Sequence, residues 1–342
     1  MNNWKQFLSL QETPASVRPG PLGVAELANG FVAPLSNLGL IAVSGADGAS
    51  FLHNQLSNDV MHLGEHEARL AAYCSPKGRM LASFLIWRTS TAIYLQLPLM
   101  LQVSIQKRLA MFVMRAKATL TDVTDSHVLF GLGGAKASDL LQTWFPDLPP
   151  TPYSTQDGPM GTLIRVADAF GAARYQWLCA PDTAQTVWLA LSAGLATGHE
   201  QAWELSQIHA GIPQITLATQ DRFVPQMVNF ELLGGVNFKK GCYPGQEIVA
   251  RSQYLGKLKR RTTLVTIPDA MASAGDEVFA SDDPSQPCGM VVNACANGVG
   301  AVDALVEMKL SAIEQAAVRL GSADGAALQL LTMPYALDAL DL

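Results

Sequence analysis

Short apolar runs separated by turns alternate with segments of helical spacing in this 342-residue chain. Residues 38–44 (LGLIAVS) have the apolar, β-branched character of a strand, and Asp47 then stands as a candidate N-cap of a helix. Further strands are predicted over residues 68–74, 80–88 and 91–97, and a helix over residues 100–112. This order predicts an α+β layer with helices on one face of an antiparallel or mixed sheet.

A second segment, residues 118–198, repeats that plan. It contains predicted strands near residues 126–132, 161–166 and 175–180, and predicted helices near residues 135–144 and 183–195. A short helix over residues 203–210 follows, and Gly211 and Pro213 end it. Two α+β layers are therefore expected before residue 256.

The pattern changes beyond Arg251. Residues 259–342 show short alternating stretches parted by Gly, Asp and Pro, which is typical of a small antiparallel barrel or sandwich. The predicted strands cover residues 262–267, 277–281, 289–294, 298–306 and 327–332. At the other end, prolines and a glycine between residues 14 and 34 predict an irregular leader over residues 1–34 with one short helix.

Composition narrows the class of protein. Hydrophobic residues make up 49% of the chain and charged residues 15%, so sizeable cores in two or three domains are expected. No window offers the roughly 18 uninterrupted apolar residues of a membrane helix, and residues 1–18 lack the apolar core of a signal peptide. We therefore expect a cytoplasmic protein without a membrane partner.

The five cysteines are odd in number and scattered, which supports neither a disulfide framework nor a metal knuckle. Cys288 and Cys295 lie seven residues apart without a second pair, so no metal site is predicted.

Charge is distributed unevenly. The formal net charge is −6, yet residues 239–261 hold seven cations against Glu247 alone, which makes this window +6 and the remainder −12. Such an edge can attract phosphate or an acidic partner. The alternative is that these cations are solvated positions on a strand edge. We favour that alternative for residues 257–261 and a functional role for Lys239 and Lys240.

One decapeptide, residues 238–247 (FKKGCYPGQE), carries candidate chemistry. Cys242 stands between Gly241 and Gly245, behind two lysines, and cations or a nearby helix start favour the reactive thiolate form of a cysteine. Gln246 and Glu247 are predicted to open a helix over residues 246–251, where a first-turn carboxylate suits the helix dipole. Equally, the glycines could merely turn the backbone while Cys242 packs as a small apolar side chain. Local chemistry leaves both readings open.

These residues also resemble a known family. Lys240-Gly241-Cys242-Tyr243-x-Gly245-Gln246-Glu247 is similar to the signature of the YgfZ proteins, folate-binding relatives of the glycine-cleavage T-protein (aminomethyltransferase). Residues 43–84, with their PKGRM turn, 203–213 (WELSQIHAGIP), 223–229 and 236–251 resemble that family in the same order. The likeness runs from about residue 35 to the C-terminus.

The resemblance implies a fold and its divisions. We expect an α+β folate-binding module of two subdomains, as in the T-protein, followed by a small antiparallel β-barrel. The first subdomain would comprise residues 35–117 and 199–256, the second residues 118–198, and the barrel residues 257–342.

The resemblance also implies a tetrahydrofolate site. Trp203 would line the folate cavity, and Gln207, one helical turn later, would bond the ring edge. Leu38 stands where an aromatic residue is often found and His209 where many relatives carry glutamate, so both depart from the family pattern. Arg79 is a hypothetical partner for the glutamate tail of folate. The structural alternatives are a core tryptophan and a plain hairpin turn.

The implied function is a tetrahydrofolate-binding accessory protein for iron-sulfur enzymes or their assembly factors, which acts through them on tRNA modification. Cys242, set by the other motif residues, would be the active centre, although one cysteine cannot hold a [4Fe-4S] cluster alone. An aminomethyl or methyl transferase is the rival, since Asn58-Asp59 resembles the T-protein's catalytic pair, but turn capping explains Asp59 more simply. Direct tRNA contact by the residue 239–261 cations stays open.

Overall fold

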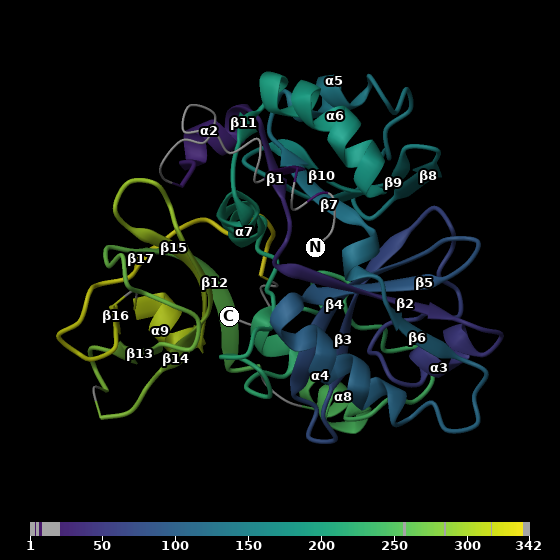
Figure 1. The fold of residues 1–342 in the computed structure, drawn as a ribbon. Coiled ribbons are helices and arrows are strands. Elements are labelled where there is room, and N and C mark those ends of the chain that lie inside the picture. Colours follow the sequence, from purple (N-terminus) through teal and green to yellow (C-terminus); the bar gives the residue numbers. More distant parts are fainter. Residues whose placement is uncertain are drawn as a thin grey trace.

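The computed structural model describes residues 4, 7–8, 21–255, 258–283, 285–315 and 317–337. Half of the predicted irregular leader, together with Lys257, therefore lies outside the described residues. The described chain forms three lobes arranged around one central helix, α7 (Glu200–His209) (Figure 1). In the described part of the chain no helix is long and apolar enough to cross a bilayer.

The first lobe is a five-stranded antiparallel sheet in the order β3-β4-β5-β2-β6. Helix α4 packs on this sheet through Leu101, Ile105 and Leu109, whose spacing gives the helix one apolar face. The strands are β2 (Leu38–Ser44), β3 (Ala68–Cys74), β4 (Met80–Arg88), β5 (Ile93–Pro98) and β6 (Thr119–Asp122), and the helices are α3 (Gly48–His53), α4 (Leu99–Ala110) and α8 (Gln246–Tyr254).

The second lobe is a six-stranded sheet in the order β11-β1-β7-β10-β9-β8. Strand β1 pairs antiparallel with β7 and parallel with β11, so residues 31–34 belong to this sheet and not to an irregular leader. The strands are β1 (Phe31–Pro34), β7 (Val128–Gly133), β8 (Thr155–Gly158), β9 (Gly161–Ala169), β10 (Ala172–Cys179) and β11 (Ala196–Thr197); the helices are α2 (Val24–Asn29), η1 (Thr124–Ser126), α5 (Ala137–Leu141) and α6 (Pro181–Gly194).

The third lobe is a curled six-stranded antiparallel sheet, half of a barrel, in the order β16-β13-β14-β15-β12-β17. The mixed fold with a C-terminal antiparallel sheet confirms the predicted fold class. Its elements, with the preceding 3₁₀ turn, are η2 (Pro225–Val228), β12 (Arg260–Ile267), β13 (Glu277–Ala280), β14 (Gly289–Ala296), β15 (Val302–Lys309), α9 (Leu310–Gln315), β16 (Val318–Leu320) and β17 (Gln329–Leu330).

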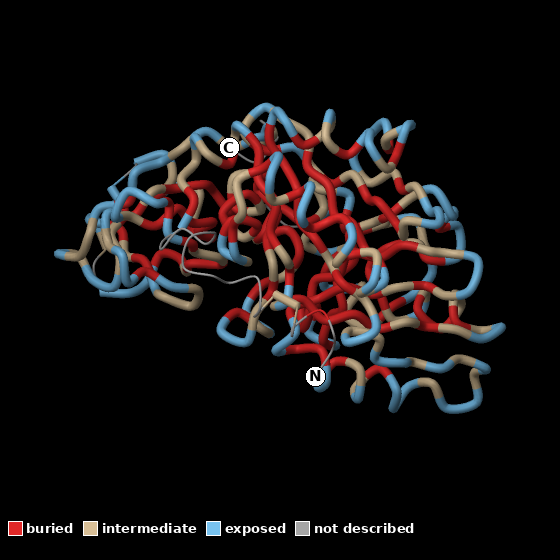
Figure 2. The backbone as a smooth tube through the Cα atoms, turned by 45° about the horizontal axis from the view of Figure 1, so that its top comes forward, coloured by how far each residue is buried: buried red, intermediate tan, exposed pale blue. Residues whose placement is uncertain are grey.

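Helix α7 joins the lobes because it is buried on several sides. It contacts β1 and β9 of the second lobe and β14 and β15 of the third. Its buried residues are Ala202, Trp203, Leu205, Ser206 and Ile208. One apolar core runs continuously from the first sheet past α7, which Figure 2 shows as buried chain through the middle of the molecule. A site at this junction is therefore held by three lobes at once.

Candidate functional site

The Cys242 loop projects from the first lobe. Cys242 and its neighbour Gly241 are exposed, whereas the other four cysteines of the chain are buried. Burial raises the pKa of three of these, the Cys74, Cys179 and Cys295 thiols, to about 12, so all three stay protonated at neutral pH. The loop therefore presents a single thiol to solvent.

Lys240 anchors this loop to the end of α3. Its ammonium donates to the backbone carbonyl oxygens of His53 and of Leu56, the latter at 2.8 Å, and lies 4.8 Å from the centroid of the Tyr243 ring. Burial lowers the Lys240 pKa to about 8, against the opposing charges of Asp59 and Cys242. Lys240 is thus a partly buried structural cation close to the thiol, and Lys239 is the exposed one.

Gly245 fixes where α8 begins. It has a φ of +80°, and a β-carbon there would lie 2.4 Å from the Ser75 carbonyl oxygen and 2.7 Å from the α-carbon of Gly78. The turn formed by the PKGR segment (residues 76–79), between β3 and β4, therefore packs directly on the Cys242 motif. Only glycine allows both the left-handed backbone and this approach.

The remaining motif residues lie around the start of α8. The Gln246 side-chain amide donates to the Lys240 carbonyl oxygen at 3.4 Å, and Glu247 is an exposed first-turn carboxylate that suits the helix dipole. Tyr243 is buried, and burial raises the pKa of its hydroxyl, which has no hydrogen-bond partner among the described residues. The motif thus combines two packed residues, Lys240 and Tyr243, with an exposed thiol.

Sequence reasoning missed a histidine beside this loop. His53 Nδ1 lies 3.1 Å from Asp59 Oδ1, and His62 Nδ1 lies 2.8 Å from Asp59 Oδ2. Burial, and then the Lys240 charge, lowers the pKa of His53, while Asp59 opposes both. Asp59 also accepts from the His62 backbone N–H at 3.1 Å, which is the turn-capping role anticipated for it. No local motif marked His53, because only the fold brings it to residue 241.

The basic window is only partly exposed. Arg260 forms a bidentate pair with Glu307, and Arg261, which is 1% exposed, pairs with Glu231. The interpretation of these two arginines as solvated strand-edge cations is therefore wrong: β12 lies between β15 and β17, and both guanidinium groups are neutralised. Neither contributes a free charge to a nucleic-acid surface.

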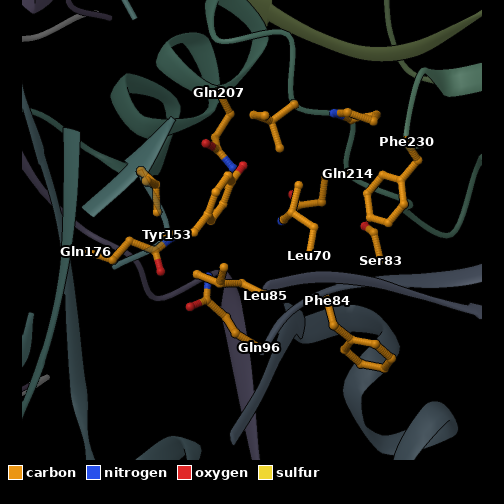
Figure 3. A pocket seen from close by; sticks show the side chains of 13 residues that line it. Leu70, Ser83, Phe84, Leu85, Gln96, Tyr153, Gln176, Gln207, Gln214 and Phe230 are labelled. Carbon is orange, nitrogen blue, oxygen red and sulfur yellow. The ribbon is translucent and has the colours of Figure 1, made fainter. Parts of the chain in front are cut away.

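A second candidate site is a pocket between the first and second lobes, closed by α7 and the segment that follows it. Gln96 reaches it from β5, Gln176 from β10 and Gln207 from α7. Figure 3 shows Gln207 and Tyr153 on one side of the pocket and Phe230 on the other. The full lining is Leu70, Ser83, Phe84, Leu85, Gln96, Tyr153, Val166, Gln176, Gln207, Ile212, Pro213, Gln214 and Phe230.

The pocket holds unsatisfied acceptors. Gln96 and Gln176 are 6% and 2% exposed, and the Oε1 atom of each has no hydrogen-bond partner in the described structure. Leaving such an atom buried and unpaired costs about 1–3 kcal/mol. The cavity volume is only about 40 Å³, against the ~300 Å³ or more of typical ligand pockets. Its chemistry suits a ligand with N–H donors, but a ring the size of a pterin needs side chains to move.

A larger cavity of about 530 Å³ adjoins this pocket and shares Gln96 with it. Leu38 lines this second cavity, together with Gly39 and Leu40 of the same strand. The two cavities therefore share one glutamine side chain, and Leu38 lines the larger one.

The other predicted folate residues lie apart from the pocket. Trp203 is 3% exposed and packs on Gly131. The Arg174 guanidinium carbon lies over the Trp203 ring, 4.8 Å from the ring centroid. His209 Nε2 lies 2.7 Å from Asp303 Oδ2 in the third lobe. Arg79 donates to the Arg222 carbonyl oxygen. Of the predicted set, Gln207 lines the pocket, and the others' contacts with folate stay predictions.

The arrangement of two α+β lobes and a curled antiparallel sheet is a fold that a solved aminomethyltransferase shares. The solved aminomethyltransferase T of the glycine cleavage system from Bartonella henselae aligns with a TM-score of 0.74 at 15% identity, over 90% of this chain and 87% of that one. The model of the GCVT N-terminal domain matches residues 29–157.

Proteins with similar sequences identify the family of this chain. The tRNA-modifying protein YgfZ of Colwellia psychrerythraea is 33% identical over 261 residues, 76% of this chain and 77% of that protein. The YgfZ protein of Escherichia coli is 31% identical over 238 residues, 68% of this chain and 70% of that protein. The chain therefore belongs to the YgfZ family of tRNA-modifying proteins.

Proposed function

We propose that this protein is a cytoplasmic tetrahydrofolate-binding accessory protein that supports iron-sulfur enzymes and, through them, tRNA modification. Membership of the YgfZ family and a fold shared with a folate-dependent class of enzymes support this proposal. Two separated sites would divide the work. The pocket between the lobes would bind folate, and the exposed Cys242 would meet the client protein.

The observation that carries the folate proposal is the pair of unpaired oxygens at Gln96 and Gln176. The two glutamines line one pocket from two different sheets. The edge of a reduced pterin bears several N–H donors, which are the partners that amide oxygens lack here. Gln207 would bond the same ring, and Tyr153 and Phe230 would lie against its faces. When bound, tetrahydrofolate would serve as a carrier of one-carbon groups.

Size sets a condition on this binding. Because the inner cavity holds about 40 Å³, a pterin enters only with movement of lining side chains. The adjoining cavity of about 530 Å³ lies beyond Gln96 and has room for the rest of the ligand. Leu38 would line that outer part. Trp203, packed under Arg174, would support Gln207 on α7 from behind.

Aminomethyl transfer is less well supported. In the described structure no carboxylate lines the inner pocket, and Asp59 instead pairs with His53 and His62 beside the Cys242 loop. A general base for the transfer would therefore be missing at the ring. Direct tRNA binding is also less well supported, since Arg260 and Arg261 are already paired.

The experiment pairs one measurement with each site. Tetrahydrofolate affinity by calorimetry is expected to fall at least about tenfold in Gln176→Leu, since two hydrogen-bonding groups are removed. Gln102→Leu is the matched control: Gln102 is equally buried and lies outside the pocket. Cys242→Ala should bind folate normally but fail to restore iron-sulfur enzyme activity in cells depleted of this protein. Unchanged affinity in Gln176→Leu would refute the pocket assignment, and full rescue by Cys242→Ala would refute the thiol's role.

A further inference from the structure

The groups around His53 support an inference that rests on the proposed role of Cys242 as a reactive thiol. His53 is the last residue of α3, and its ring lies against the Cys242 loop. A β-carbon at Gly241 would lie 3.6 Å from His53 Nε2, and within the described structure only this imidazole comes within 4 Å of that position. One ring nitrogen thus faces the residue that precedes the thiol.

The other ring nitrogen is held by a carboxylate. Asp59 Oδ1 lies 3.1 Å from Nδ1, closer than the backbone N–H groups of Val60 and Met61 at 3.4 and 3.5 Å. A carboxylate oxygen accepts a hydrogen bond from Nδ1–H, so it favours the tautomer that carries hydrogen on Nδ1. Nε2 then keeps a lone pair on the side of Gly241.

Lys240 completes the group. Its charge acts on His53, Asp59 and Cys242 alike, which places the ammonium among all three. Together with Asp59 and His62 it makes up the titratable groups that act on His53 in the described structure. Since burial and Lys240 lower the pKa of His53, its imidazole is neutral at pH 7 and able to accept a proton.

We propose that His53, oriented by Asp59, accepts the proton of the Cys242 thiol. The S–H bond breaks and an N–H bond forms at Nε2, so the products are a thiolate and an imidazolium. The thiolate forms near the Lys240 ammonium and the imidazolium beside the Asp59 carboxylate, so each new charge meets an opposite one. A nucleophile, a base and an orienting acid act in these same roles in cysteine-dependent enzymes.

Alkylation of the native protein by iodoacetamide, followed by mass spectrometry, tests this proposal. Cys242 is the exposed cysteine among the five, and Cys242→Ser gives the background. The thiolate displaces iodide and forms a thioether. We expect His53→Asn, which keeps a donor toward Asp59, to slow alkylation at pH 7 at least about tenfold. Asp59→Asn should act in the same direction, and all rates should converge near pH 10, where a thiol ionises unaided.

His62→Asn is the matched control. It removes an imidazole that contacts the same carboxylate at 2.8 Å but is 83% exposed, so it should slow alkylation far less than His53→Asn does. If His53→Asn slows alkylation equally at pH 7 and pH 10, His53 has a purely structural role and the proposal is overturned. The proposal is also overturned if both His53→Asn and Asp59→Asn are alkylated at the wild-type rate. If wild type reacts no faster at pH 7 than a free cysteine, the thiol role in the proposed function fails as well.

Discussion

Gly78 and Gly245 pack against each other although 167 positions separate them in the chain, so that a β-carbon on Gly245 would lie 2.7 Å from the α-carbon of Gly78. This contact joins the PKGR turn after β3 to the start of α8. The thiol loop is therefore supported by backbone of the first sheet. Its position does not depend on flexible side chains alone.

Gly245→Ala is expected to destabilise the fold strongly. The left-handed backbone costs a side chain about 1–2 kcal/mol, and the approach of 2.4 Å to the Ser75 carbonyl oxygen forces the backbone to shift for about 1–3 kcal/mol more. Gly300→Ala is the control, because Gly300 has a φ of +83° but no atom within 4 Å of its β-carbon position. Urea unfolding measures both variants. Equal losses would mean that the contact with Gly78 has no energetic weight.

The charge of Lys240 makes stability depend on pH. Its pKa is lowered to about 8, chiefly by burial, so the folded chain releases this proton at lower pH than the unfolded chain. The unfolded state then binds more protons, and stability rises with pH across this range. The stability of wild type relative to Lys240→Met should thus increase between about pH 8 and pH 10. Urea unfolding of both proteins at the two pH values measures this difference in the free energy of unfolding. If the difference does not change with pH, the burial assigned to Lys240 is contradicted.

Replacement of a pocket glutamine should stabilise the ligand-free protein. The Gln176 Oε1 atom is buried without a partner, and Leu fills a similar volume without an unpaired oxygen. Gln176→Leu is expected to raise the free energy of unfolding by up to about 1–3 kcal/mol. Gln102→Leu should lower it instead, because the Gln102 amide donates to Gln106 at 2.8 Å. Thermal unfolding without folate compares them, and a loss of stability in Gln176→Leu would show that its oxygen is satisfied.

His209 and Asp303 link α7 to the third lobe. Burial raises the Asp303 pKa, but bonds from His209, Thr266 and Asn297 outweigh it and leave the pKa lowered. A carboxyl group whose pKa is lowered by folding stabilises the folded state at pH values above its unfolded pKa. This stabilisation is lost as the pH falls through the pKa of the folded state. The advantage of wild type over Asp303→Asn should therefore shrink below about pH 4. Chemical unfolding at pH 7 and pH 3 tests this.

Asp283→Asn serves as the control for that comparison, because Asp283 is a partly exposed residue at the surface whose carboxyl pKa is also lowered, first by a bond from Gln286. Solvent screens such a group, so a much smaller pH-dependent difference is expected. In addition, His209→Glu would place two carboxylates at the 2.7 Å contact and should destabilise the fold. A stable His209→Glu protein would show that Asp303 is free to move away.

The order of strands and helices could be predicted from the sequence because local periodicity reports it. Residues 38–44, 68–74 and 80–88 were predicted as strands and form β2, β3 and β4 with the same bounds. Short strands escaped prediction. Strand β16 (Val318–Leu320) spans only three residues, and β1 (Phe31–Pro34) spans four and follows a proline-rich segment. Neither is long enough to show an alternating pattern of apolar and polar residues.

By itself the sequence determined the family and the motif with Cys242, since both are written in consecutive residues. It also determined the alternation that builds each sheet. Only the tertiary structure decided which side chains meet. His53 comes to Gly241 across 188 positions, Gln96 and Gln176 reach one pocket from two sheets, and Arg261 finds Glu231 across 30. No local pattern encodes such contacts, because they arise when separate sheets and helices bury their apolar faces together.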